Sequence, residues 1–320
     1  MSGSIFAGIN LIPRALPAAP APRFQSSRVR SVAPMLGGQI DHPELLPGAL
    51  FQSFTIVGTL GDGAFGKVYE AIDYKNGRLV AIKTSYKPLQ ENAESLGLTF
   101  SPADGKENVT EIFGGGITPN GIHYTVIELI SGEDLGTRLY KEGPLEVRKA
   151  LMYLYQILKG VAYCHKVLHI IHKDIKPGNV LVKENNDVKI ADFGTAAKLP
   201  NRNGGGTDQY ASPEQYYFKP VDERSDLYSV GIMLFQMLTE KHPYTDESFK
   251  ITDSDIIPEI LKNQDTETLS PQLDALPRRI RILIKRLIDV EPGWRYQNAD
   301  DALEAVSKLL SLPDNELLVV

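Results

Sequence analysis

Apolar and polar residues follow one another in short runs through the first part of the chain, from residue 51 to about residue 128. The stretch FTIVGTLGDGAFGKVYEAID contains two apolar runs joined by a glycine-rich turn. Further short runs follow in GRLVAIKTS and on either side of TPNG in EIFGGGITPNGIHYTVIEL. Short runs bounded by turn residues are typical of β-strands. The pattern predicts a mainly β region, with one short helix over residues 88–100, whose interior contains Gly97.

The spacing of apolar residues changes after about residue 131. In GPLEVRKALMYLYQILKGVAYCHKVL the apolar residues recur at the spacing of one helix face. Helical spacing returns over residues 225–238, 271–287 and 299–312. The first of these ranges contains the apolar stretch VGIMLFQML, which predicts a buried core helix. The chain is therefore expected to be α+β, with a small β-rich lobe over residues 51–131 and a larger, mainly helical lobe over residues 132–315.

Composition narrows the class of protein and of partner. The 320 residues carry a net charge of −6, which argues against a nucleic-acid partner. A single cysteine, Cys164, excludes an intrachain disulfide framework, and its helical spacing predicts a buried structural thiol. No apolar run reaches the roughly 18 residues of a membrane span, so a soluble chain is expected. The oligomeric state is left open.

The N-terminal segment, residues 1–50, differs from the rest. Its first 40 residues contain Arg14, Arg23, Arg28 and Arg30 but no Asp, Glu or Lys. Such a composition cannot pack a core and predicts disorder. An acid-free segment with Arg and Ser also fits an organelle transit peptide, which would direct the chain to a chloroplast or mitochondrion. A plain tail on a cytoplasmic protein is the other interpretation, and both stay open.

The glycine-rich turn LGDGAFGKV has the spacing G-x-G-x-x-G-x-V between two predicted strands. Glycines let backbone N–H groups approach phosphate oxygens without interference from a Cβ atom. Tight hairpins also use glycine, so the turn alone is a weak signal. A dinucleotide-binding fold would need a helix after this turn, whereas the strand-like KVYEAID follows, so that interpretation fails.

Three further stretches carry polar residues at the ends of apolar runs. VAIK ends in Lys83, HKDIKPGNV contains Asp174, Lys176 and Asn179, and DFG begins with Asp192. Each has a structural interpretation as well, since a lysine ending a strand is often solvated and a charged loop often only connects two buried elements. An aspartate directly after a buried strand needs a strong partner, for which a divalent metal is suitable.

Taken in order, LGDGAFGKV, VAIK, HKDIKPGNV, DFG and GTDQYASPE resemble the motif set of the eukaryotic-type (Hanks-type) serine/threonine protein kinases. The resemblance extends from about residue 54 to residue 310. It implies a bilobal kinase fold that binds ATP and Mg²⁺ between its lobes. The implied reaction transfers the γ-phosphoryl group of ATP to Ser or Thr hydroxyls of a protein substrate. Lys176 and Thr207 resemble the Ser/Thr-specific branch.

The resemblance also implies roles for the polar residues. Asp174 would orient the substrate hydroxyl and accept its proton, and Lys176 would neutralise the transferring phosphoryl group. Asn179 and Asp192 would hold the magnesium ions.

Other residues would hold the nucleotide. Lys83 would bind the α- and β-phosphates, and Val68 and Ala81 would enclose the adenine in front of Ile127. The hinge from Glu128 to Ile130 would offer backbone hydrogen bonds to the adenine edge, and Asp134 would meet the ribose. The phosphate-covering loop would comprise Leu60, Gly61, Asp62, Gly63, Ala64, Phe65, Gly66, Lys67 and Val68.

Two positions depart from the family pattern or leave a choice open. Lys173 stands where the family usually has an arginine that binds a phosphate on the activation loop, and lysine lacks the bidentate fork. We therefore expect activity without phosphorylation of the loop centre. The glutamate that pairs with Lys83 is either Glu91 or Glu94, and the spacing favours Glu94.

Further matches imply structural roles. Glu214 would pair with Arg295, Asp226 would brace the backbone of the HKDIKPGNV loop, and His172 would be a buried scaffold residue. Two alternatives to an active protein kinase remain: a pseudokinase that binds nucleotide and scaffolds partners, and a small-molecule kinase of similar fold. The first is disfavoured because a degenerate member should lack at least one of four residues that are all present: Lys83, Asp174, Asn179 and Asp192. GTDQYASPE argues against the second, since in the family this segment forms the floor on which the peptide docks.

Overall fold

The computed structural model describes residues 45–63, 66–85, 108–198, 207, 209–244, 263 and 269–319. The chain divides into two units, Met1–Gly38 and Gln39–Val320, and every described residue belongs to the second. Most of the N-terminal segment and the helix predicted over residues 88–100 lie outside the described residues. The same is true of Ala64, Phe65, Glu91 and Glu94.

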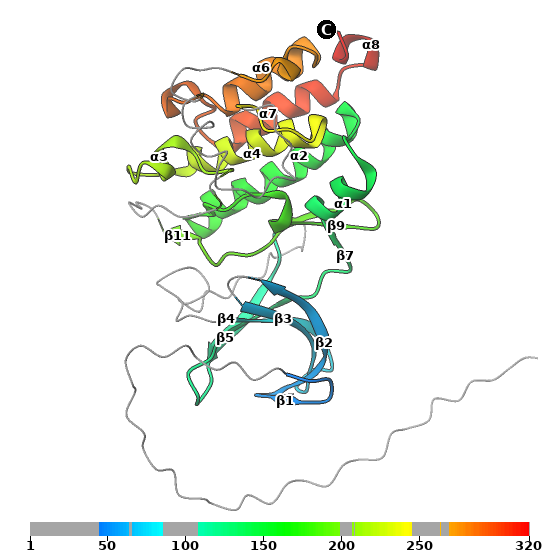
Figure 1. Ribbon diagram of the computed structural model, residues 1–320, viewed down its shortest axis with the longest axis vertical. Coiled ribbons are helices and arrows are strands. Elements are labelled where there is room, and N and C mark those ends of the chain that lie inside the picture. Colours follow the sequence, from blue (N-terminus) through cyan, green and yellow to red (C-terminus); the bar gives the residue numbers. More distant parts are fainter. Residues whose placement is uncertain are drawn as a thin grey trace, which may run out of the picture. The chain divides into compact units, whose positions relative to one another are not determined.

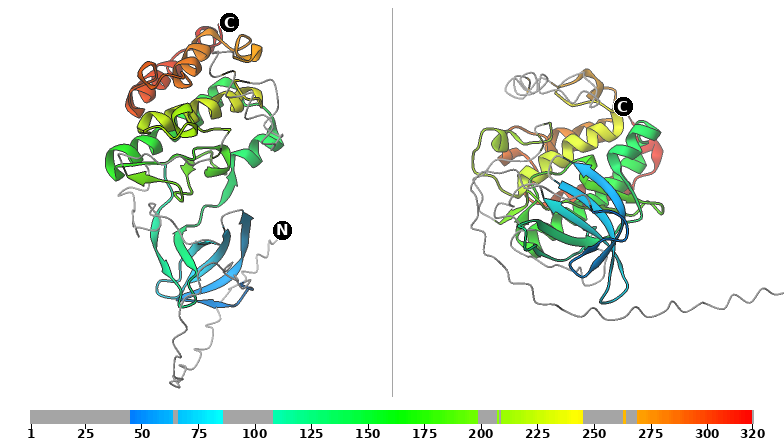
Figure 2. Two further views of the ribbon diagram at one scale, coloured as in Figure 1. Left: turned by 60° about the vertical axis from the view of Figure 1, so that its left-hand side comes forward. Right: turned by 60° about the horizontal axis from the view of Figure 1, so that its bottom comes forward.

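The described residues of the smaller lobe form an antiparallel sheet with the strand order β1-β2-β3-β4-β6-β5. Its strands are β1 (Leu50–Phe51), β2 (Phe54–Gly63), β3 (Gly66–Asp73), β4 (Leu79–Ser85), β5 (Ile112–Ile117) and β6 (His123–Glu128). The sheet curls around an apolar core that includes Ile56, Tyr69, Val80, Ile82 and Val126 (Figures 1 and 2). The β-rich first lobe is confirmed.

The larger lobe is mainly helical, as predicted. Its helices are α1 (Leu135–Glu142), α2 (Val147–Tyr163), α3 (Pro213–Tyr216), α4 (Glu223–Thr239), α6 (Arg278–Leu287), α7 (Ala299–Leu310) and α8 (Asp314–Leu317). A π-helical turn, η1 (Cys164–Leu168), continues α2 and buries Cys164, whose thiol pKa is raised by burial. Among the described residues, no helix is long and apolar enough to cross a membrane.

One helix prediction was wrong in part. Residues 271–287 do not form a single helix: a 3₁₀ turn, η4 (Pro271–Leu273), comes first, and α6 begins only after Pro277. The cause is Pro277, which occupies the N-cap of α6 in an extended conformation and has no backbone N–H to give a preceding turn. The predictions over residues 225–238 and 299–312 are confirmed by α4 and α7.

Short strands at the start of the larger lobe carry the polar motifs. A three-stranded sheet has the order β10-β9-β7 and comprises β7 (Gly132–Asp134), β9 (Val180–Lys183) and β10 (Val188–Ile190). A second ladder pairs β8 (Ile170–Ile171) with β11 (Ala197–Lys198). The HKDIKPGNV loop runs from β8 to β9 through the 3₁₀ turn η2 (Pro177–Asn179), and DFG follows β10. Rigid strands thus flank both polar motifs.

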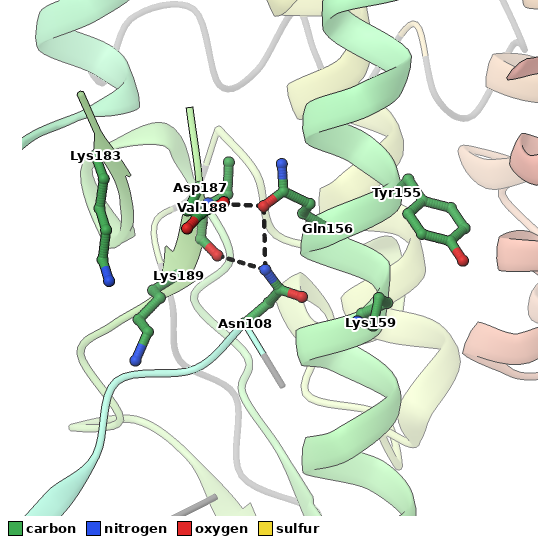
Figure 3. A pocket seen from close by; sticks show the side chains of 8 residues that line it. All are labelled: Asn108, Tyr155, Gln156, Lys159, Lys183, Asp187, Val188 and Lys189. Atoms are coloured by element: carbon green, nitrogen blue, oxygen red, sulfur yellow. Dashed lines mark hydrogen bonds between the residues drawn. The ribbon is translucent and has the colours of Figure 1, made fainter. Parts of the chain in front are cut away.

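A backbone joint links the segment before β5 to β10. The N–H of Ile190 donates to Asn108 O and the N–H of Thr110 donates to Ile190 O, each at 2.8 Å. The side-chain amide of Asn108 donates to Val188 O at 2.7 Å and to Gln156 Oε1 on α2 at 3.2 Å (Figure 3). These bonds join β10 both to α2 and to the segment that enters the smaller lobe.

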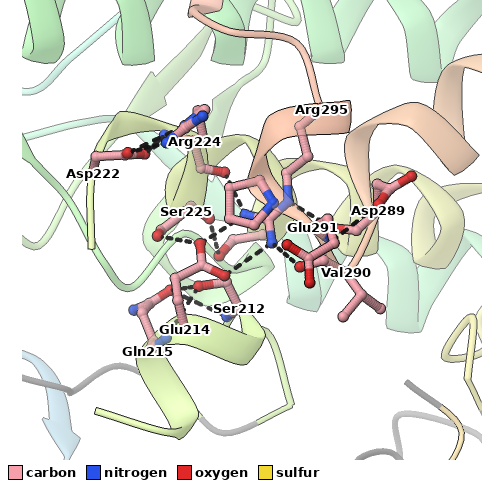
Figure 4. A network of polar contacts seen from close by, with 12 residues as sticks. Ser212, Glu214, Gln215, Asp222, Arg224, Ser225, Asp289, Val290, Glu291 and Arg295 are labelled. Atoms are coloured by element: carbon pink, nitrogen blue, oxygen red, sulfur yellow. Dashed lines mark hydrogen bonds and ion pairs between the residues drawn. The ribbon is translucent and has the colours of Figure 1, made fainter. Parts of the chain in front are cut away.

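Glu214 and Arg295 form a buried ion pair in the larger lobe, as predicted. Arg295 Nη1 and Nη2 donate to the two carboxylate oxygens of Glu214 at 2.7 and 2.9 Å, and Ser225 Oγ donates to the same carboxylate at 2.6 Å (Figure 4). Burial raises the pKa of Glu214, but the hydrogen bonds and charge of Arg295 outweigh burial, so the pKa lies below its ordinary value. The pair ties α3 to the segment between α6 and α7.

The core helix α4 is buried on nearly all sides, which confirms the interpretation of VGIMLFQML. Gly231 lies at its closest approach to α6. A Cβ atom at this position would lie 2.6 Å from both Leu287 Cβ and Ile288 Cγ2. Helix propensity alone would favour alanine here, by about 1 kcal/mol. Packing therefore selects glycine against local preference.

We predict that Gly231→Ala lowers the free energy of unfolding by about 1–2 kcal/mol, because overpacking of about 1–3 kcal/mol exceeds the gain in helix propensity. Urea unfolding measures the change. Gly293→Ala is the matched control: a Cβ there meets nothing within 4 Å, so its effect should stay within about 0.5 kcal/mol. Equal or greater stability of Gly231→Ala would contradict the packing argument.

Candidate active site

The backbone of the HKDIKPGNV loop rests on one buried carboxylate. Asp226, on α4, is fully buried, and its two oxygens accept hydrogen bonds from the N–H groups of His172 and Lys173 at 2.8 Å each. His165 Nε2 lies 2.8 Å from Asp226 Oδ2, to which it donates, since a carboxylate can only accept. The predicted bracing role of Asp226 is confirmed.

The partners of Asp226 also decide its protonation. Burial raises the pKa of its carboxyl, whereas the hydrogen bond from His165, the electrostatic interactions with the His165 and His172 side chains and the N–H of His172 lower it. The pKa of Asp226 lies below its ordinary value, so the group is anionic at neutral pH. The charge keeps the loop backbone in place, including Lys173, whose φ of 67° is a left-handed conformation.

His172 and Gln215 fix the loop from either side. The Asp174 N–H donates to His172 Nδ1 at 3.3 Å, so the ring proton is on Nε2, which donates to Ala191 O at 3.1 Å. His172 is buried, as predicted, and its ring packs on Phe193 of the DFG motif with centroids 5.0 Å apart. Gln215 Nε2 donates to Lys173 O at 2.8 Å.

Asp174 lies at the centre of a compact polar cluster. Lys176 Nζ is 3.0 Å from Asp174 Oδ2 and donates to Thr207 Oγ1 at 2.6 Å. The Thr207 hydroxyl donates in turn to Asp174 Oδ1 at 2.7 Å. Asn179 Nδ2 donates to Asp174 Oδ2 at 3.0 Å and to its backbone carbonyl at 2.8 Å. The Asp174 carboxylate is thus held in one orientation.

Asp192 lies next to this cluster and contacts the other lobe. The Ala191 N–H donates to Asn179 O at 2.8 Å, which joins the DFG motif to η2. Lys83 on β4 donates to Asp192 Oδ1, and the Gly194 N–H donates to the same oxygen at 3.2 Å. Burial raises the pKa of Asp192, but the charge and hydrogen bond of Lys83 outweigh it and lower the pKa. Lys83 thus contacts Asp192, whereas Glu91 and Glu94 lie outside the described residues.

Asn179 and Asp192 have the chemistry of a magnesium site. Mg²⁺ prefers oxygen ligands and is commonly held by one or two carboxylates together with substrate phosphates. Asn179 uses its amide nitrogen towards Asp174, and Asp192 uses one oxygen towards Lys83. No described residue donates to the remaining oxygens, Asn179 Oδ1 and Asp192 Oδ2. The described residues hold no cluster of three or more His, Cys, Asp or Glu. Phosphate oxygens and water would complete the shell of a magnesium ion bound at Asn179 and Asp192.

The glycine-rich turn is the hairpin between β2 and β3. Gly66 requires glycine, since its φ is 154° and a Cβ would lie 1.6 Å from Thr84 O on β4. Val68 pairs with Lys83 in the sheet register, which places both at the site. The other described residues of the turn follow along the same two strands: Leu60, Gly61, Asp62, Gly63 and Lys67.

The residues expected at the adenine and ribose lie on β3, β4 and β6 and in the segment that leads from β6 to α1. The Glu128 N–H donates to Glu111 O at 2.9 Å, so this donor is already used within the smaller lobe. Ala81 is buried opposite Ile127 in the register of β4 and β6. Asp134 caps α1, accepting from Thr137 N at 2.9 Å and from Thr137 Oγ1 at 2.6 Å. Ile130 is the second residue after the end of β6.

A protein-family model described as "Protein kinase domain" matches residues 54–306 of this chain. The chain belongs to the protein kinase family. The matched range contains every polar motif of the site and both lobes of the fold. The expected fold class, an α+β bilobal kinase fold, is therefore confirmed.

Named relatives agree with this family. A probable serine/threonine-protein kinase of Clostridium acetobutylicum is 31% identical over 273 residues, covering 81% of this chain and 40% of that protein. The serine/threonine-protein kinase PknA of Corynebacterium glutamicum is 33% identical over 264 residues, covering 78% and 54%. An Aurora kinase of Dictyostelium discoideum is 30% identical over 274 residues, covering 81% and 70%. The chain spans about half or less of the length of the two bacterial relatives.

Sequence reasoning missed several residues of this kinase site. Gln215 could have been found, since Ser212 and Gln215 have capping-box spacing and do form that box at the start of α3. His165, which donates to Asp226, lies in an apolar-rich stretch and has no sequence motif of its own. The side-chain partners of Asn108, Glu128 and Lys189 had no local signal, because each partner is distant in sequence.

We predict that Asp226→Asn destabilises the kinase domain by about 3–5 kcal/mol at pH 7, because it removes the buried charge that holds the loop and His165. The native pKa is lowered, so the contribution is present above the ordinary carboxyl value and shrinks as the pH falls below about 4. Urea unfolding of wild type and variant from pH 3 to pH 7 measures this. A difference independent of pH would contradict it.

Proposed function

We propose that this chain transfers the γ-phosphoryl group of ATP to Ser or Thr hydroxyls of protein substrates. The observation that carries the proposal is the polar cluster in which Asp174, Lys176 and Thr207 bond to one another while Asn179 joins them to Asp192 and Lys83. In the proposed reaction this cluster supplies a base, two cations and two oxygen ligands for Mg²⁺. Phosphoryl transfer needs that combination, because it depends on positioning and charge stabilisation.

The proposed mechanism uses each residue at a stated atom. The substrate hydroxyl gives its proton to an Asp174 carboxylate oxygen as its own oxygen bonds to the γ-phosphorus. The bond between the γ-phosphorus and the β,γ-bridging oxygen breaks, and ADP leaves with the electron pair. Lys176 Nζ balances charge on the transferring group, and Lys83 Nζ would move from Asp192 towards the α- and β-phosphates. Mg²⁺, held by Asn179 and Asp192 when bound, would neutralise the β- and γ-phosphate oxygens.

Specificity for Ser and Thr rests on the contact between Lys176 and Thr207. Both side chains contact Asp174 as well as each other, and so they lie directly beside the proposed base. The relatives reported above that are named serine/threonine-protein kinases support the same assignment. The alternative, a pseudokinase scaffold, would keep nucleotide binding and lack turnover.

We predict that Asp174→Asn lowers kcat at least about 100-fold on a generic Ser/Thr protein substrate, because the base is lost. Its affinity for ATP with Mg²⁺ should stay within a few-fold of wild type. Asp187→Asn is the matched control: Asp187 is an exposed carboxylate on the loop between β9 and β10, and its activity should be unchanged. Wild-type protein that binds ATP without turnover would instead establish the pseudokinase alternative.

We also propose that residues 1–50 direct the chain to an organelle, because the first 40 residues combine four arginines with no acidic residue. A fluorescent fusion of the whole chain should then locate to a chloroplast or mitochondrion, and a fusion lacking residues 1–50 should remain in the cytoplasm. Identical location of the two fusions would contradict a targeting role and leave the segment as a plain tail.

A further inference from the structure

An ion pair links the end of β6 to the strand that leads to Asp192. Lys189 Nζ, on β10, donates to Glu128 Oε1 at 2.8 Å and to Glu128 Oε2 at 2.6 Å. The Lys189 side chain is 7% exposed and the Glu128 side chain 22%. Sequence reasoning assigned Glu128 only a backbone role, so its carboxylate is a separate feature. Each residue belongs to a different lobe.

The Glu128 carboxylate is also held within its own lobe. The Glu111 N–H donates to Glu128 Oε2 at 3.2 Å, and the Glu128 N–H donates to Glu111 O at 2.9 Å. The carboxylate is thus fixed before it meets Lys189. In the other lobe, Lys189 is next to Ile190, whose N–H donates to Asn108 O and whose C=O accepts from the N–H of Thr110. Both partners are anchored by backbone bonds.

A second ion pair spans the lobes close by. Asp192 follows Lys189 by three residues and accepts from Lys83 on β4. β4 and β6 are neighbours in the sheet, with Lys83 opposite Thr125 and Val80 opposite Glu128. The contacts therefore close a ring that runs from β6 through β4, Lys83 and Asp192 to β10, and returns through Lys189 to Glu128. The hinge backbone and Asp192 lie on this ring.

Stability alone does not account for such a pair. Moving two charges out of water costs several kcal/mol per ion, and replacing a buried pair by apolar residues is often neutral or stabilising. An ion pair whose partners are both anchored instead fixes the relative position of the two elements that it joins, because it resists their movement. A ligand that contacts both elements then meets a pocket of fixed width, and less of its binding energy is spent on ordering the protein.

We propose that Glu128 and Lys189 are positioning residues that set the affinity for nucleotide by fixing the hinge backbone relative to Asp192. This inference rests on the proposed function, since it takes ATP to span the hinge and Asp192. Neither side chain need touch the nucleotide. Loss of the pair should therefore weaken nucleotide binding more than it slows phosphoryl transfer.

The test measures KM for ATP, kcat and the Kd of a non-hydrolysable ATP analogue with Mg²⁺, using the full chain. In Glu128→Gln, both KM for ATP and Kd should rise about tenfold, equivalent to about 1.4 kcal/mol, while kcat falls by a smaller factor and KM for the protein substrate does not change. Lys189→Met should act in the same direction. The exchanged pair Glu128→Lys with Lys189→Glu should recover part of the affinity lost in either single charge reversal.

Glu142→Gln is the matched control, since Glu142 pairs with Lys149 within one lobe at 2.8 Å and its side chain is 43% exposed. Its KM for ATP should equal that of wild type. Thermal unfolding shows whether each variant folds. If a single variant does not fold, the affinity of the exchanged pair for nucleotide provides the test instead. If KM for ATP and the Kd of the analogue are unchanged in a folded Glu128→Gln variant, this inference is wrong, while the proposed function is unaffected. Wild type without turnover would overturn the proposed function, and the Kd of the analogue would still test the pair.

Discussion

The site depends on one buried negative charge beneath the loop that carries Asp174. A carboxylate without contact to water is stable only when hydrogen-bond donors surround it, and Asp226 has three: two loop N–H groups and the ring of His165. The same bonds force the loop backbone at Lys173 into a left-handed conformation that a lysine rarely adopts. The orientation of Asp174 is therefore fixed from below by the core helix α4.

A series of hydrogen bonds joins the HKDIKPGNV loop to the DFG motif. His172 contacts Ala191, Ala191 contacts Asn179, and Asn179 contacts Asp174. A shift of either motif would break bonds in the other, so the two loops behave as one rigid body. Two ion pairs join the smaller lobe to this part of the larger lobe. Lys83 pairs with Asp192, and Glu128 pairs with Lys189. The site therefore combines two loops that hydrogen bonds hold together in the larger lobe with ion pairs to the smaller lobe.

Much of this could be predicted from the sequence, and the reason differs between elements. The helices α4 and α7 and the strands around the glycine-rich turn follow from periodicity, which is a local property. The grouping of Lys83, Asp174 and Asp192 came only from resemblance to a family, because no local pattern brings together residues so distant in the chain. The contacts of Asp226 and Arg295 were expected on the same basis.

The rest depended on three-dimensional packing. The division of residues 271–287 follows from Pro277, a residue whose effect was visible but was outweighed by the apolar spacing around it. The ion pair between Glu128 and Lys189 had no signal at all, since lysine on a strand is ordinarily solvated and only the fold places a carboxylate next to it. Gly231 is similar: its role appears only when α6 lies against it.

A crystal structure of the full chain with Mg²⁺ and a non-hydrolysable ATP analogue tests the proposed site most directly. We expect a single nucleotide whose phosphates lie against Lys83 Nζ, with a metal ion bound by Asp192 and Asn179 oxygens and Asp174 facing the γ-phosphate. A nucleotide bound elsewhere, or one whose phosphates contact none of these four residues, would contradict it.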